Sequence, residues 1–216
     1  MTDRHDAIVK VLLERYGRSY CGEAGITLAD KPAPLYQLLV LATLLSTRIS
    51  ADIAVAAARE LFHAGYRTPA AMAGASWQDR VDALGRGHYR RYDESTATRL
   101  GDGAALVTER WGGDLRKLHS EGGDDADRLA GLLTGFPGIG PTGASIFLRE
   151  VQAVWPGVAP YLDRKTLDGA RAIGLPSQAG PLAGLVHRTQ LADLAAALVR
   201  VSLSHDAAEE VKAASR

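Results

Sequence analysis

Cysteine is almost absent from the sequence, because Cys21 is the single one in 216 residues. One thiol cannot form a disulfide within the chain, and it cannot supply a four-cysteine zinc or iron–sulfur site. A chain of this length buries roughly 70% of the surface that its unfolded form exposes, so it needs no covalent cross-link to fold. This composition is typical of a protein from a reducing compartment.

Long hydrophobic runs are also missing. Residues 1–14 are charged and contain no long apolar stretch, so they do not form a signal-peptide pattern. The longest apolar run, within residues 35–45, is too short to cross a bilayer. We therefore expect a cytoplasmic protein with no membrane partner.

The chain has no excess of either charge, because 25 basic residues balance 25 acidic ones. Domains that bind nucleic acid are often basic overall, so this balance counts mildly against such a partner. The charges are segregated, however. Residues 86–91 hold three arginines and a histidine, whereas residues 121–127 hold four acids and no base, which permits one basic face.

The histidines show no pair at the spacing of metal ligands, so the sequence predicts no transition-metal site. The six are His5, His63, His88, His119, His187 and His205.

Apolar residues recur at helical spacing nearly throughout, and no segment alternates long enough to predict a strand. Residues 35–45 are apolar on every side, which predicts a helix buried in the middle of a domain. The fold class is therefore expected to be all-α. The expected helices cover residues 8–16, 35–45, 52–62, 69–73, 77–84, 96–111, 126–133, 142–154, 163–174 and 190–204.

The segment Phe-Pro-Gly-Ile-Gly-Pro at residues 136–141 joins two of these helices in a tight turn. Gly138 and Gly140 allow unusual backbone angles, and their missing side chains let a phosphate approach the main chain. The second helix begins there, so its free N–H groups and positive dipole end face the same point. Pro141 suits the first turn of that helix, and Ile139 is expected to hold the two helices together. The turn therefore predicts an anion site that needs no lysine.

Residues 132–144 as a whole resemble the helix-hairpin-helix motif of the endonuclease III-like DNA glycosylases, a family also called HhH-GPD. Three further segments are similar to the family in the expected order, over about residues 34–174. Residues 44–50 resemble its Leu-Leu-Ser-x-Gln segment, residues 68–73 its Thr-Pro-x-x-Met helix and residues 87–89 its Gly-(Leu/Phe)-Tyr turn.

The resemblance implies a two-lobed helical protein of base-excision repair that binds, as a monomer associated with the nucleoid, duplex DNA carrying a damaged or mispaired base. One domain, residues 33–154, would be a helical barrel that ends in the hairpin. Residues 1–32 and 155–216 would form the second domain. We expect the active site in the cleft between Asp163 and residues 46–48.

Asp163 matches the aspartate that the family carries after the second helix of the hairpin. Breaking the bond between base and sugar builds positive charge on the sugar, which a carboxylate stabilises while it positions the attacking water. The simpler alternative is that Asp163 only caps a helix, since aspartate is a favoured N-cap residue.

Thr142 stands where bifunctional members of the family carry a lysine that attacks the sugar. Threonine has no amine and cannot form the Schiff base that leads to strand cleavage. The departure implies a monofunctional glycosylase. Two alternatives stay open, namely a DNA-binding protein without catalysis and an abasic-site lyase that uses Lys165 or the N-terminal amine.

Other side chains are assigned from the same resemblance and from their charge. Arg48 is expected either to fill the gap left by a flipped base or to be an ordinary surface residue. Tyr89 is expected either to stack on that base or to pack in the core, and Trp77 and Trp111 are expected to pack in the core. The predicted DNA contacts are Gly138, Ile139, Gly140, Thr142, Gly143, Arg48, Arg86, Arg90 and Arg91, and the predicted base pocket is Ser46, Thr47 and Tyr89. For Arg86, Arg90 and Arg91 the alternative is a solvated basic loop.

Many relatives carry an iron–sulfur cluster on four cysteines near the C-terminus. This sequence has no cysteine after Cys21, so no such cluster is expected. The resemblance implies one inorganic ligand, a monovalent cation held by backbone carbonyls at the hairpin.

Overall fold

The computed structural model describes residues 3–215, and throughout that range the regular structure is helical. The predicted all-α fold class is confirmed. The chain divides into two compact units, one running from Cys21 to Leu148 and the other formed by the residues up to Tyr20 and from Arg149 onward.

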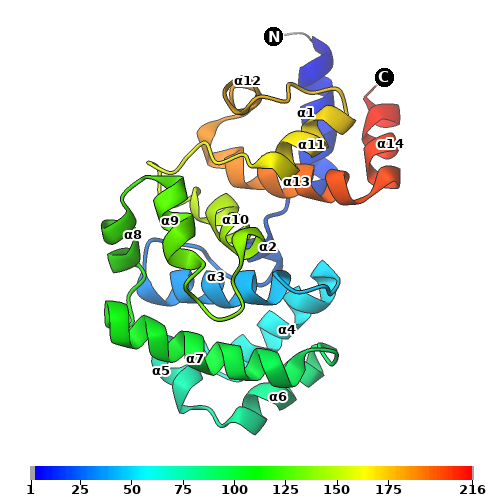
Figure 1. Cartoon of the computed structure of the whole chain (residues 1–216). Coiled ribbons are helices and arrows are strands. Elements are labelled where there is room, and N and C mark those ends of the chain that lie inside the picture. Colours follow the sequence, from blue (N-terminus) through cyan, green and yellow to red (C-terminus); the bar gives the residue numbers. More distant parts are fainter. Residues whose placement is uncertain (1–2, 216) are drawn as a thin grey trace. The chain divides into compact units, whose positions relative to one another are not determined.

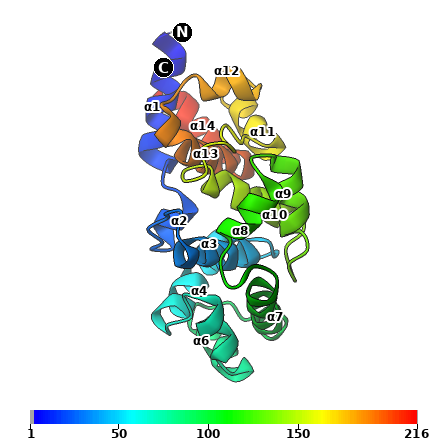
Figure 2. The ribbon, with the colours of Figure 1, turned by 90° about the vertical axis from the view of Figure 1, so that its left-hand side faces the viewer.

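The larger unit is built around α3 (Pro32–Leu45). Every residue of α3 from Leu38 to Leu44 is buried, as the unbroken apolar pattern predicted. The helices α4 (Ala51–His63) and α7 (Asp93–Trp111) pack on α3, and α9 (Ala126–Leu133) and α10 (Pro141–Val151) lie on its other side (Figures 1 and 2). This central helix therefore forms the support on which the hairpin between α9 and α10 rests.

Two short helices of this unit begin at the predicted signals. Thr68 caps α5 (Pro69–Gly74), and its side chain accepts the N–H of Ala71. Ser76 and Asp79 form the reciprocal capping box that starts α6 (Trp77–Arg86). Local side-chain chemistry therefore fixes both starts, although α6 runs past its expected end at Gly85.

The two tryptophans predicted to be core residues differ. Trp111 is 3% exposed and stacks on Phe136, with ring centroids 5.4 Å apart, so its prediction is confirmed. Trp77 is 41% exposed, and its indole N–H donates to Thr98 at 3.1 Å. The core prediction for Trp77 is wrong because this residue opens α6, where one side of the ring faces solvent.

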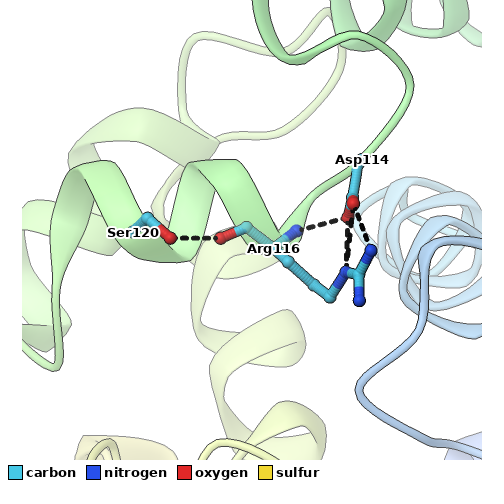
Figure 3. A network of polar contacts seen from close by, with 3 residues as sticks. All are labelled: Asp114, Arg116 and Ser120. Carbon is cyan, nitrogen blue, oxygen red and sulfur yellow. Dashed lines mark hydrogen bonds and ion pairs between the residues drawn. The ribbon is translucent and has the colours of Figure 1, made fainter.

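Helix α8 (Arg116–Gly122) was not predicted, since the glycines and charges of residues 112–125 resemble a loop. The Asp114 carboxylate accepts the backbone N–H of Arg116 at 3.0 Å and binds its guanidinium at 2.6 Å (Figure 3). The Arg116 carbonyl in turn accepts the Ser120 hydroxyl at 3.0 Å. The Asp114 side chain thus accepts the first N–H group of this helix from a position two residues before the helix begins.

The smaller unit packs α1 (Asp3–Tyr16), α11 (Arg164–Ala172) and α14 (His205–Ala214) on α13 (Leu191–Leu203) (Figure 2). A short helix α12 (Ala179–Ala183) and a 3-10 turn η1 (Arg188–Gln190) connect them. Gly169 of α11 lies directly against the Leu198 carbonyl of α13, where any β-carbon would overlap it. This glycine lets the two backbones approach closely.

The unit boundaries differ from the expected ones at residues 32/33 and 154/155. The Glu23 carbonyl, at the end of α2 (Tyr20–Glu23), accepts hydrogen bonds from Arg59 of α4, which ties α2 to the larger unit. At the other boundary Gln152 exchanges hydrogen bonds with the backbone of Tyr161, at 2.9 and 3.1 Å, within the smaller unit. Helix α10 also ends at Val151 rather than at residue 154.

None of the helices within residues 3–215 is both long enough and apolar enough to cross a membrane.

Candidate functional site

The hairpin between α9 and α10 is held from below by buried side chains. Phe136 and Ile139 are each 4% exposed, and the Phe136 carbonyl accepts the N–H of Ile139 at 3.1 Å. Gly138, between them, has φ of +87°, a conformation that side-chain-bearing residues adopt only at a cost. The turn is therefore anchored by two buried apolar residues, whereas its glycines lie at the surface.

The outer side of the hairpin presents unsatisfied backbone donors. Gly138, Gly140 and Thr142 are exposed, and within residues 3–215 their N–H groups donate to no acceptor. Gly140 and Thr142 flank Pro141 at the start of α10, where the helix dipole is positive. Exposed N–H groups at such a point suit an anion, and anion binding here stays a prediction.

Gly143 and Ser46 meet behind this turn. A β-carbon on Gly143 would overlap the Ser46 hydroxyl and would lie 3.1 Å from Ile139. The Ser46 hydroxyl already donates to the Ala42 carbonyl at 2.5 Å. Ser46 therefore acts in this structure as a contact between α3 and the first turn of α10.

Thr47 and Tyr89 are also joined, at 2.6 Å between their hydroxyl oxygens. Thr47 spends its one hydroxyl proton on the Leu44 carbonyl at 3.0 Å, so Tyr89 is the donor of the pair. Tyr89 is fully buried. Of the two alternatives for Tyr89, the structure shows core packing, and no face of its ring is free to stack on a base in this conformation.

The four predicted arginine contacts are all exposed, but they differ in their partners. Arg86 forms an ion pair with Glu60 at 3.2 Å, which offsets its charge. Arg91 lies over the Tyr92 ring at 5.3 Å. Arg48 and Arg90 form no ion pair with any described residue. Contact of these four with DNA stays a prediction.

Asp163 lies in the smaller unit and caps α11, as one of the two sequence alternatives predicted. Its Oδ1 accepts the N–H of Thr166 at 3.1 Å, and the Thr166 hydroxyl donates to the Asp163 carbonyl at 2.6 Å. The side chain is 17% exposed, and its Oδ2 accepts no hydrogen bond from the described part of the chain. Oδ1 of Asp163 thus caps α11, and Oδ2 is left as a hydrogen-bond acceptor for another group.

Arg149 is a residue that the sequence reasoning missed. Its Nη1 lies 3.8 Å from Asp163 Oδ1, and this nitrogen is buried without a hydrogen-bond partner among the described residues. The pair is therefore held by charge and not by a hydrogen bond. No sequence signal could have found it, because the two residues are brought together by the turn between α10 and α11.

The lyase alternative names two amines, that of Lys165 and the N-terminal amine, and the second lies outside the described residues. Thr142 and Lys165 are both exposed. Thr142 carries a hydroxyl where an amine would be required for Schiff-base chemistry.

The residues do not fit an iron–sulfur cluster. The chain contains one cysteine, Cys21, and it is buried at α2 in the larger unit. Residues 3–215 contain no group of three or more histidine, cysteine, aspartate or glutamate side chains that could hold a metal ion.

No protein-family model and no curated protein matches the chain. Solved structures that resemble the chain include two endonuclease III–DNA complexes, and the fold comparison rests on the first of them. One is a non-covalent endonuclease III–DNA complex, with a TM-score of 0.50 and 13% sequence identity over 92% of this chain and 85% of that chain. The other is a trapped endonuclease III–DNA covalent intermediate with an estranged adenine, with a TM-score of 0.46 and 16% identity over the same shares. The chain therefore has an endonuclease III-like fold.

Proposed function

We propose that this protein is a DNA glycosylase that acts on duplex DNA carrying a damaged or mispaired base. The hairpin carries this proposal. Its exposed N–H groups, on a turn anchored by buried Phe136 and Ile139, suit a backbone phosphate. The likeness in fold to endonuclease III, whose solved structures include complexes with DNA, supports the choice of partner.

In the proposed reaction water attacks the sugar carbon, the glycosidic bond breaks, and the base leaves with the bonding electrons. The Asp163 carboxylate stabilises the positive charge on the sugar and takes the proton from the water. The products are a free base and an intact strand with an abasic site. Because Thr142 has no amine, the hairpin binds DNA but does not attack it, and the enzyme is monofunctional.

The test uses labelled duplexes that each carry one alkylated, deaminated, oxidised or mismatched base. Strand breaks that appear only after alkali treatment support the monofunctional reaction. Asp163→Asn should abolish base release and leave the affinity for DNA nearly unchanged. Base release at the normal rate by this variant would remove Asp163 from the mechanism.

A second candidate function is DNA binding without catalysis. It is favoured by the surroundings of Asp163, since the positive charge of Arg149 at 3.8 Å opposes the charge that must develop on the sugar. In that case the protein binds the duplexes and releases no base from any of them.

An abasic-site lyase that uses Lys165 or the N-terminal amine is separated by borohydride trapping. Only a Schiff-base enzyme becomes covalently attached to an abasic duplex under these conditions. The proposed glycosylase remains unattached.

We propose further that the protein acts as a monomer on the nucleoid and that the hairpin holds a monovalent cation. The carbonyls of Pro137 and Gly138 accept no hydrogen bond from the described residues, so they suit such an ion. Comparing DNA affinity in sodium, potassium and tetramethylammonium chloride at one ionic strength tests the cation.

A further inference from the structure

The hairpin has a cationic neighbour that does not belong to the motif. The β-carbon that Gly138 lacks would lie 2.8 Å from Arg99 Cδ and 3.7 Å from its Cγ. Arg99 belongs to α7, and 39 residues separate it from Gly138. The aliphatic part of Arg99 therefore lies across the glycine at the tip of the hairpin.

Arg99 lies among apolar residues of α7 and the hairpin. It lines a small pocket with Leu100, Phe136 and Pro137. Burying the methylenes while the head stays near solvent is the usual arrangement for a long cationic side chain at a surface. The stem therefore lies beside the hairpin among apolar residues, and the guanidinium begins one bond beyond the carbon nearest to Gly138.

The guanidinium has no partner in the described part of the chain. Arg99 is half-buried and forms no hydrogen bond or ion pair there. Asp102 follows it by three residues on the same helix, and the two form no ion pair. Arg86 and Arg110, by contrast, are each paired with a glutamate.

We propose that Arg99 binds the same DNA phosphate as the hairpin N–H groups and adds a charged side chain to a turn that has none of its own. This inference rests on the proposed function. An arginine fork donates two parallel hydrogen bonds to a phosphate, which a backbone N–H cannot do. A glycine at position 138 leaves room for both Arg99 and the phosphate, because a side chain there would displace Arg99 and block the approach of the phosphate.

The dependence of DNA affinity on salt tests the proposal. Each phosphate neutralised by a cationic side chain adds about 0.9 to the slope of log affinity against log salt concentration on duplex DNA. Backbone N–H groups carry no net charge and leave this slope nearly unchanged. Removing Arg99 should therefore reduce the slope by about 0.9 and weaken binding at low salt about tenfold.

The variant is Arg99→Gln, because glutamine keeps carbon atoms at the γ and δ positions, which lie nearest to Gly138, and removes the charge. Arg99→Lys keeps the charge and loses the fork, so it should restore the slope but not the full affinity. Arg4→Gln is the matched control, since it removes one exposed arginine from α1 in the other unit. Circular dichroism and urea unfolding of each variant establish that it is folded.

The probe is a fluorescein-labelled duplex with a tetrahydrofuran abasic-site analogue, and binding is followed by anisotropy over a range of potassium chloride concentrations. If the wild type does not bind the duplex, the proposed function fails and the role of Arg99 fails with it. If the wild type binds, and the slope for Arg99→Gln equals that for Arg4→Gln, the role of Arg99 is overturned while the proposed function stands.

Discussion

Substitution of Asp163 should remove two separate contributions to the stability of the smaller unit, because this residue has two structural partners. It caps α11 through Thr166, and it faces the buried charge of Arg149. Asp163→Asn keeps the cap, since asparagine is as good an N-cap residue as aspartate, and removes only the charge. Asp163→Ala removes both.

The two contributions differ in size. The attraction between unit charges 3.8 Å apart is about 4 kcal/mol at an effective dielectric constant of about 20, before desolvation is subtracted. The two side chains are only 11% and 17% exposed, so desolvation cancels part of it, and we expect a net loss of about 2 kcal/mol for Asp163→Asn. Loss of the cap adds about 1 kcal/mol, which gives about 3 kcal/mol for Asp163→Ala.

Urea unfolding of the two variants, of Arg149→Met and of the double variant Arg149→Met/Asp163→Asn measures these values. If the pair is the cause, the double variant should be less destabilised than the sum of the single ones by about 2 kcal/mol. Additive losses, or an Asp163→Asn variant as stable as the wild type, would refute the assignment of the pair. Thermal unfolding of Asp163→Asn gives the temperature range in which this variant is fully folded, so that its base release can be assayed without interference from unfolding.

Three further predictions concern the larger unit. Tyr89→Phe should lower the free energy of unfolding by about 1 kcal/mol through loss of the bond to Thr47 and should leave DNA affinity unchanged; a weaker complex at unchanged stability would instead make Tyr89 a DNA contact. The hydrogen bond from Trp111, and after it the bond from Arg110, lowers the pKa of Glu121. The stability that ionised Glu121 contributes should therefore be fully present above its ordinary pKa of 4.5 and be lost as the pH falls through the lowered value of the folded state. The difference in thermal midpoint between the wild type and Glu121→Gln should shrink across that acid range, and a difference independent of pH would contradict this linkage. Thr142→Lys should gain a borohydride-trapped complex with an abasic duplex if the hairpin faces the sugar, and absence of the complex in a variant that still binds would place the sugar elsewhere.

The features that the sequence predicted well depend on neighbours close along the chain. The buried α3 follows from an apolar run, and the N-caps at Thr68, Ser76 and Asp163 follow from residues at most three positions apart. The inward direction of Ile139 is likewise a property of its own turn. Such signals are local, so one sequence is enough to find them.

The features that were missed depend on contacts between distant segments. Arg99 lies beside Gly138 only because α7 packs below the hairpin, and Arg149 faces Asp163 only because of the turn between their helices. The exposure of Trp77 depends equally on which elements happen to cover it. Periodicity assigns a residue to a face of its helix, but it does not say what lies opposite that face.

The balanced charge of the chain is compatible with DNA binding if the binding site is made mostly of backbone. N–H groups at Gly138, Gly140 and Thr142 bring no net charge, so a chain with equal numbers of acids and bases can present them. Such a site should depend less on salt than one built from many lysines, because few counterions are released when it binds. If Arg99 is the one cationic side chain at the hairpin, it contributes about 0.9 to the total slope. Any larger slope then comes from Arg48, Arg86, Arg90 and Arg91. The measured slope therefore counts how many of these predicted arginines contact phosphates, and it does so before any lesion is identified.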